Sequence, residues 1–136
     1  MKILLCYLKF NQKKEEGGQK NMAIGFKVDV EVQGDKRILR LEGKLDAVTS
    51  PMLENKISAL MEKNHKKLLI EFGRIEYLSS AGMRLLLATT KKLKAQGGLC
   101  VLSSINDDVL EIIKMAGFER ILNIYSNEQD ALAALS

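Results

Sequence analysis

The sequence of 136 residues lacks tryptophan and has one proline, one histidine and two cysteines, Cys6 and Cys100. Two cysteines are too few to hold together a disulfide-framed secreted module or to build a cysteine zinc site. The purely apolar runs are only a handful of residues long, whereas crossing a bilayer takes about 20. The sequence therefore predicts no disulfide framework, no structural metal and no membrane span.

The composition is that of a globular protein. Hydrophobic residues make up 46% of the chain and charged residues 28%, which is too apolar for a disordered chain and sufficient for the core of one domain. The opening segment 1–8 is apolar but ends at Lys9 without a small-residue cleavage site, so it does not fit a signal peptide. We therefore expect a soluble, cytoplasmic protein.

The formal net charge of +4 lies mostly in the first 21 residues, where five lysines face two glutamates. Residues 22–136 are left close to neutral. A nucleic-acid-binding domain presents a broad basic face, and a nearly neutral domain argues against one. No nucleic-acid partner is expected.

Residues 1–21 are interpreted separately from residues 22–136, because the periodic, foldable pattern begins only after Met22. The segment 15–18, Glu-Glu-Gly-Gly, can be encoded by purine-rich codons containing GGAGG, a bacterial ribosome-binding sequence, and three codons then precede Met22. One hypothesis is a misassigned start, with Met22 as the natural first residue. The other is a disordered polar tail.

From Met22 onward, hydrophobic spacing predicts alternating strands and helices. The expected elements are a strand over 26–33, a turn at Gly34 and Asp35, a strand over 37–42, a helix from its N-cap Ser50 to about Lys63, a strand over 68–72, a helix over 80–96, a strand over 99–102, a helix capped by Asn106 or Asp107 and closed by Gly117, a strand over 122–125, and a helix over 127–135 capped by Ser126. This order predicts a single α/β domain: a mixed sheet with an antiparallel entry hairpin, then parallel strands, and four helices.

The predicted loops 43–50 and 73–82 follow strands and precede helices, which is where α/β sheets place their working surface. Ser79 and Ser80 stand at the start of a long helix, where unpaired backbone N–H groups can receive a phosphate. One interpretation is that either serine is an ordinary N-cap. Another is an anion or nucleotide sensor at Ser80, although no glycine-rich cradle accompanies it.

Enzyme chemistry is not expected. The segment 78–82, Leu-Ser-Ser-Ala-Gly, resembles a nucleophile elbow without its first glycine. However, His65 precedes the strand that leads to this segment, which places it about 20 Å away, beyond hydrogen-bond reach. Phosphate-binding loops, dinucleotide fingerprints and histidine-carboxylate metal spacings are missing from the sequence. Cys100 lies within a predicted strand and is interpreted as a small buried hydrophobe. No cofactor is therefore expected.

Four segments, in order, carry a resemblance to a known family: 41–46 (Leu-Glu-Gly-Lys-Leu-Asp), 77–84 (Tyr-Leu-Ser-Ser-Ala-Gly-Met-Arg), 96–98 (Gln-Gly-Gly) and 115–118 (Met-Ala-Gly-Phe). Together they resemble the motifs of bacterial STAS domains, specifically the anti-sigma factor antagonists. The resemblance covers about residues 24–135. It implies a non-enzymatic protein-interaction module that regulates transcription.

The resemblance also implies a partner-switching cycle. The family's phosphorylated serine directly follows the motif aspartate and falls on Ser80, with Ser79 a less favoured alternative. The implied partner surface comprises Asp46, Ser79, Ser80, Gly82 and Met83. The unmodified protein would bind an anti-sigma factor that is also a serine kinase, phosphorylation would release it, and a PP2C-type phosphatase would reset the cycle. This hypothesis requires the Ser80 hydroxyl to be exposed at a helix start.

Two positions depart from the family pattern. Ser79 stands where the family often has aspartate, and Lys44 where it often has glutamate. The departures leave open whether Ser80 is phosphorylated, whether Ser79 is used instead, or whether the domain binds without regulation. The alternative function is a STAS subunit or scaffold of a lipid-transport or stress-signalling complex without a phosphorylation cycle.

Overall fold

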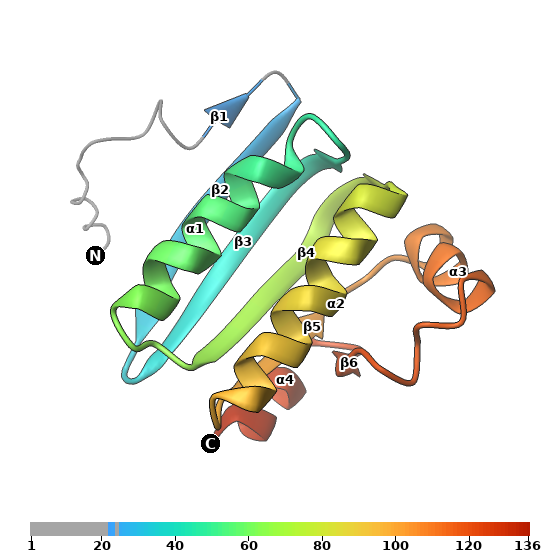
Figure 1. The fold of residues 1–136 in the computed structure, drawn as a ribbon. Helices are drawn as coiled ribbons and strands as arrows, with labels where there is room; N and C mark the ends of the chain where they lie inside the picture. Colours follow the sequence, from blue (N-terminus) through green and yellow to red (C-terminus); the bar gives the residue numbers. More distant parts are fainter. Residues whose placement is uncertain (1–21, 24) are drawn as a thin grey trace.

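The computed structural model describes residues 22–23 and 25–136, so the two hypotheses for residues 1–21 lie outside the described residues. Strands and helices alternate after an initial hairpin (Figure 1). The elements are β1 (Met22–Ala23), β2 (Phe26–Gln33), β3 (Lys36–Leu45), α1 (Ser50–Glu62), β4 (Lys67–Leu78), α2 (Ser80–Ala95), β5 (Leu99–Ser103), α3 (Asp107–Met115), β6 (Ile124–Tyr125) and α4 (Glu128–Leu135). The predicted α/β domain is confirmed.

The strands form one six-stranded sheet in the order β1-β2-β3-β4-β5-β6. β1, β2 and β3 pair antiparallel, and β3 to β6 pair parallel. The predicted entry hairpin turns at Gly34 and Asp35, and Gly34 adopts a φ of +62° that glycine tolerates. β1 was not predicted, because two residues are too short to show any periodicity.

The two faces of the sheet are covered differently. α1 and α2 lie side by side over one face (Figure 1), and that side holds the larger core, which includes Leu68 and Ile70 of β4 and Leu86 of α2. On the opposite face, Leu69 of β4 packs with Ala131 of α4 in a smaller cluster. Successive strand residues point to opposite faces, which is why neighbours in β4 belong to different cores. The central strand is therefore apolar on both sides, as expected for parallel strands.

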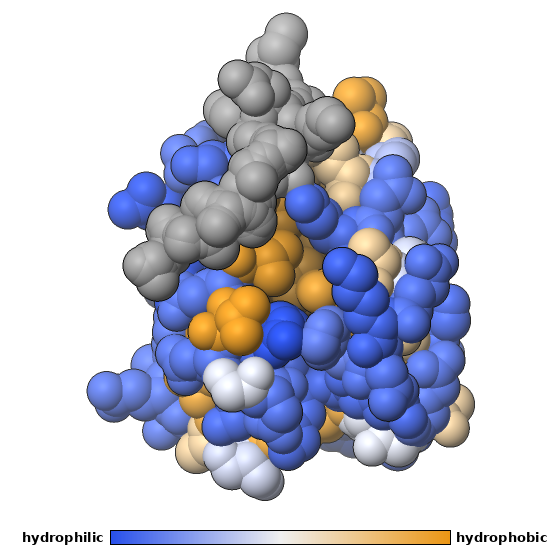
Figure 2. Space-filling model, turned by 90° about the vertical axis from the view of Figure 1, so that its left-hand side faces the viewer, coloured by the Kyte–Doolittle hydropathy of each residue, from blue (hydrophilic) through white to orange (hydrophobic). Residues whose placement is uncertain are grey.

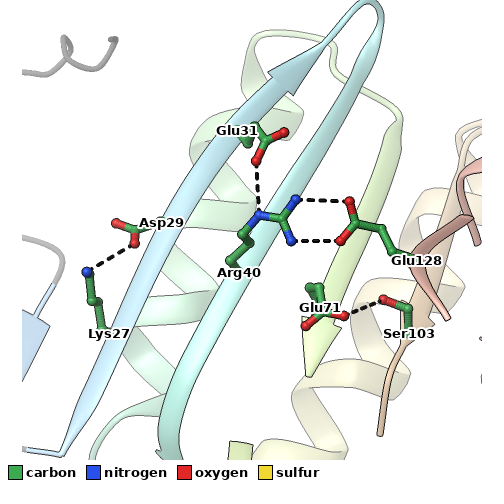
Figure 3. Close-up of polar contacts among 7 residues, drawn as sticks. All are labelled: Lys27, Asp29, Glu31, Arg40, Glu71, Ser103 and Glu128. Atoms are coloured by element: carbon green, nitrogen blue, oxygen red, sulfur yellow. Dashed lines mark hydrogen bonds and ion pairs between the residues drawn. The ribbon is translucent and has the colours of Figure 1, made fainter. Parts of the chain in front are cut away.

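α4 covers only part of its face, and an arginine fixes its first turn to the sheet. Arg40 of β3 donates two parallel hydrogen bonds to the Glu128 carboxylate, at 2.7 and 2.9 Å, and one of 2.9 Å to Glu31 of β2 (Figure 3). These bonds raise the pKa of Arg40 and lower that of Glu128. The hollow on the part of this face that α4 leaves open is lined mostly by charged side chains, among them Lys27, Asp29, Glu42 and Arg74.

β4 is longer than predicted, running to Leu78 where a loop from Gly73 was expected. Two register shifts on β4 opposite β3 account for the difference. They interrupt the two-residue alternation, so the buried side chains fall at Phe72, Ile75 and Leu78, three residues apart. A spacing of three does not read as a strand in the sequence. As a result, only Ser79 separates β4 from α2.

Two helix caps also differ from the prediction. Ser50 is the first residue of α1 and not its cap, because the chain turns earlier and the Ser50 N–H donates to the Asp46 carbonyl. Asn127, not Ser126, caps α4, accepting a 2.8 Å hydrogen bond from the Asp130 N–H. The predicted alternative Asn106 caps α3 in the same way. Asparagine is as good an N-cap as serine, so the sequence alone did not separate Ser126 from Asn127.

The surface is mostly hydrophilic. Figure 2 shows the side with α1 and β2, where hydrophobic groups are scattered among polar ones. The exposed large hydrophobic residues are spread over the described chain: Val32, Val48, Tyr77, Met115 and Ile121. Of the helices between Met22 and Ser136, none has the length and apolar character that crossing a membrane requires.

Candidate functional site

The two predicted working loops meet at one edge of the sheet. β3 and β4 run parallel and end together, with Leu45 opposite Leu78. The Ser79 N–H then donates a 2.9 Å hydrogen bond to the Leu45 carbonyl. Asp46, which follows β3, and Ser79 and Ser80, which follow β4, therefore belong to the same edge of the sheet.

Asp46 organises the turn between β3 and α1. Its Oδ1 accepts hydrogen bonds from the N–H groups of Val48, at 2.9 Å, and Thr49, at 3.0 Å. The Thr49 N–H is the largest cause that lowers the pKa of Asp46. Thr49 in turn accepts from the Asp46 N–H at 2.9 Å. Asp46 therefore remains ionised at neutral pH and holds the turn beside Ser80.

Ser79 is the N-cap of α2. Its backbone is extended, and its Oγ accepts a 3.2 Å hydrogen bond from the Gly82 N–H. Serine and aspartate are both preferred N-caps, so the departure from the family's aspartate preserves the cap and removes only the charge. The Ser79 hydroxyl is partly buried and engaged as an acceptor.

Ser80 is the first residue of α2 and is exposed. Among the described residues its hydroxyl has no hydrogen-bond partner, and the backbone N–H groups of Ser80 and Ala81 also have none. The positive end of the helix dipole lies at this terminus. The segment is thus neither sealed nor within a strand, which is the arrangement that the switching hypothesis requires.

Gly82 and Met83 lie beneath this surface. Met83 is 6% exposed and belongs to the main core. Gly82 is buried, and a Cβ at that position would come within 3.0 Å of the Leu45 carbonyl oxygen and 2.8 Å of Leu78 Cδ1. In this conformation both residues support the first turn of α2, and their predicted contact with a partner stays a prediction.

A groove between α1 and α2 opens next to this turn. It has a volume of about 370 Å³ and is lined by Ala47, Ser50, Pro51, Glu54, Ala81, Arg84, Leu85 and Ala88. Ser50 is 8% exposed, and its Oγ has no hydrogen-bond partner among the described residues. Within the described ranges, Arg84 and Glu54 of this groove form no ion pair. Sequence reasoning missed this groove, because its two walls come from different helices that are far apart in the sequence.

The residues considered for enzyme chemistry are not brought together. His65 precedes β4 and Ser80 follows it, so about 40 Å of extended strand separates them at about 3.3 Å per residue. His65 instead lies 3.4 Å from Arg37. Burial raises the pKa of the Cys100 thiol to about 12, which leaves it unreactive. Within the described ranges, no group of three or more His, Cys, Asp or Glu residues could hold a metal ion.

Known proteins are similar to this chain in sequence and in fold. The STAS domain matches residues 27–131. BtrV of Bordetella bronchiseptica, which bears the name of an anti-sigma factor antagonist, is 30% identical over 94 residues, or 69% of this chain and 81% of BtrV. The anti-sigma F factor antagonist of Paenibacillus polymyxa is 26% identical over 113 residues, or 82% of this chain and 97% of that protein. The phosphorylated form of SpoIIAA from Bacillus has a TM-score of 0.62 at 21% identity and covers 80% of this chain and 99% of SpoIIAA.

The names of these sequence relatives describe regulatory binding proteins, and the expectation that the chain is not an enzyme is confirmed by them. The likeness to SpoIIAA concerns the fold alone. The family match extends over most of the described domain and includes the Asp46 turn and the start of α2. The chain therefore belongs to the STAS domain family.

Proposed function

We propose that this protein is a cytoplasmic anti-sigma factor antagonist whose binding to an anti-sigma factor kinase is switched off by phosphorylation of Ser80. The observation that carries the proposal is the Ser80 hydroxyl at the first residue of α2, which is exposed and has no hydrogen-bond partner in the part of the chain that the structure describes. The names of the relatives BtrV and the anti-sigma F factor antagonist support the kind of partner. The same fold in phosphorylated SpoIIAA supports the kind of modification.

The modification transfers the γ-phosphoryl group of ATP to Ser80. A bond forms between Ser80 Oγ and phosphorus, the bond to the leaving ADP breaks, and the hydroxyl proton passes to a base of the kinase. Ser80 is a better acceptor than Ser79, because the Ser79 hydroxyl is partly buried and caps the Gly82 N–H. The N–H groups of Ser80 and Ala81 are available to the added phosphate.

The partner would contact the edge where β3 and β4 end. Asp46, Ser79 and Ser80 supply its polar part, and the exposed side chains of Val48 and Tyr77 flank it. Gly82 and Met83 act from below by holding the turn in place. A phosphate brings about −1.5 to −2 charges into this contact, so the interface becomes unfavourable while the domain stays folded. A PP2C-type phosphatase would restore the binding form.

The test combines the purified protein with ATP and the anti-sigma factor kinase encoded in the same genome, followed by mass spectrometry of the peptides. We expect a single phosphate on Ser80, no phosphate in Ser80→Ala, and continued phosphorylation of Ser80 in the matched variant Ser79→Ala. Phosphorylation of Ser80→Ala to the wild-type extent would contradict the proposal.

A second candidate function is a STAS subunit of a lipid-transport or stress-signalling assembly that works without phosphorylation. One observation favours it: Ser79 removes the carboxylate that the family often places beside the acceptor serine. Purification from the native cell discriminates the two, since a transport ATPase would accompany the scaffold and a GHKL-type kinase would accompany the antagonist.

A further inference from the structure

Arg84 is the basic residue that lies one helical turn after Ser80. Both belong to α2, and residues four apart on a helix are neighbours on its surface, with about 5–6 Å between their Cβ atoms. Arg84 is exposed, and among the described residues its guanidinium makes no hydrogen bond or ion pair. A cation without a partner among residues 22–23 and 25–136 thus stands one helical turn from the Ser80 hydroxyl.

The groove beside Arg84 is also lined by a residue with an unused hydroxyl. Ser50 lines it together with Arg84 and Ala81 and is 8% exposed. Its hydroxyl oxygen is buried and lacks a partner among residues 22–23 and 25–136. A buried hydroxyl without a hydrogen bond is uncommon in folded proteins. Glu54 is the acidic side chain that lines the groove, and it forms no ion pair with Arg84. The donor that the groove can offer to an oxygen-rich group is therefore the exposed guanidinium of Arg84.

We propose that Arg84 binds the phosphate of phosphorylated Ser80 in an ion pair within α2. The natural occurrence of this contact rests on the proposed function, since it requires Ser80 to be modified. The guanidinium fork fits phosphate oxygens in two parallel hydrogen bonds. The free N–H groups at the start of α2 complete the receiving site.

This contact explains how the domain tolerates the modification. The phosphate gains a cation, two backbone donors and the positive end of the helix dipole, so the first turn of α2 is held more firmly. At the same time Arg84 is withdrawn from the groove, and any partner that uses that groove loses a positive charge. Phosphorylation would then alter the surface in two ways: it adds the negative charge of the phosphate, and it engages the Arg84 guanidinium in an ion pair.

The test installs phosphoserine at position 80 by genetic encoding, so no kinase is needed and its result is independent of the proposed function. The proton affinity of the phosphate is followed by ³¹P NMR during a pH titration. In wild type we expect it to be about threefold weaker than in Arg84→Gln, because a neighbouring cation favours the dianion. Arg84→Lys should restore part of the difference, since it keeps the charge and loses the fork.

Two matched variants make the assignment specific. Arg120→Gln removes an exposed arginine elsewhere and should leave the phosphate titration as in wild type. Lys44→Gln removes a cation near the end of β3, and it should change the titration less than Arg84→Gln. Equal proton affinity in wild type and Arg84→Gln, or a larger effect of Lys44→Gln, would overturn the proposal. Thermal unfolding of each variant verifies that it is folded.

Discussion

Two hollows on the surface of the domain differ in whether the charged side chains that line them are paired. The hollow on the open sheet face has a volume of about 300 Å³ and is lined by Lys27, Asp29, Arg40, Leu41, Glu42, Glu71 and Arg74. Every charged side chain in it has a partner. Figure 3 shows Lys27 paired with Asp29, Arg40 with Glu31 and Glu128, and the hydrogen bond that Glu71 accepts from Ser103. Arg74 pairs with Glu42, and Glu71 also accepts from the Gly73 N–H.

The groove between α1 and α2 is the opposite case. Arg84 and Glu54 have no partners among the described residues, Ser50 has an unused hydroxyl, and Ser80 stands free beside it. Paired charges bring elements together, as Arg40 does for α4 and the sheet. Within the described part of the chain, the unpaired groups at the start of α2 make no contact that stabilises the unmodified fold. This fits a surface that binds a partner or a phosphate.

The largest effect on stability is expected at the apolar support beneath the groove. Leu45 is fully buried at the end of β3, below the first turn of α2. Leu45→Ala should lower the free energy of unfolding by about 2–5 kcal/mol, because it leaves a cavity. The neighbouring Val48→Ala should change it by less than about 0.5 kcal/mol, since Val48 is 80% exposed. Urea denaturation measures both, and similar losses would contradict the assignment of Leu45 to the core.

Next in size is the cap of α2. Ser79→Ala should cost about 1 kcal/mol, because the Gly82 N–H loses its acceptor. Ser79→Asp should keep the cap and restore the charge that the family pattern has. Ser80→Ala should leave stability nearly unchanged, because the Ser80 hydroxyl makes no hydrogen bond among the described residues. The thermal unfolding midpoints of the three variants compare Ser79, which caps the helix, with Ser80, whose hydroxyl has no partner among the described residues.

On the paired face, Arg40→Gln should lower stability by about 1 kcal/mol or less, since a partly exposed ion-pair network is screened by solvent. The loss should be local: hydrogen exchange should speed up most in α4, which Arg40 fixes through Glu128. Lys27→Gln, which removes one exposed pair with Asp29, is the matched control. Unchanged exchange in α4 after Arg40→Gln would show that apolar packing alone holds this helix.

The smallest expected effect is the loss of stability at acidic pH that comes from Asp46. The folded protein holds the pKa of Asp46 below its ordinary value of 3.8, so the unfolded chain binds this proton more readily. The stabilising contribution is complete above the ordinary value and is lost as the pH falls through the lowered pKa. The difference in free energy of unfolding between wild type and Asp46→Asn should therefore become smaller as the pH drops below about 4. A gap that stays constant down to acid unfolding would show that the charge of Asp46 is not what holds the turn.

The sequence predicted the elements that rest on regular periods and local chemistry. The alternation of Phe26, Val28, Val30 and Val32 predicted β2, and the spacing along 80–96 predicted α2. Ser79 and Ser80 were both identified at a helix start. Which of the two caps the helix depends on which hydroxyl accepts from the Gly82 N–H, and in the structure it is Ser79. That detail is set by backbone geometry and is not written in the residue types.

The rest depends on register and on packing across the chain. The two extra residues in β4 break the strand pattern, so the strand to Leu78 was taken for a loop. Asp46 turns the chain before Ser50 and displaces the predicted cap. Ser50 and Arg84 belong to different helices, and only the packing of α1 against α2 places them in one groove. The hydrophobic periodicity of one helix cannot reveal which residues of another helix lie next to it.

The central claim is that a charge on Ser80 changes what the domain binds without unfolding it. Calorimetric titration of the unmodified and the Ser80-phosphorylated protein against the anti-sigma factor kinase of the same genome tests this directly, with thermal unfolding of both forms recorded alongside. The account predicts that phosphorylation weakens binding at least about tenfold, or about 1.4 kcal/mol, while both forms unfold cooperatively. Equal affinity of the two forms, or a phosphorylated protein that is already unfolded, would contradict it.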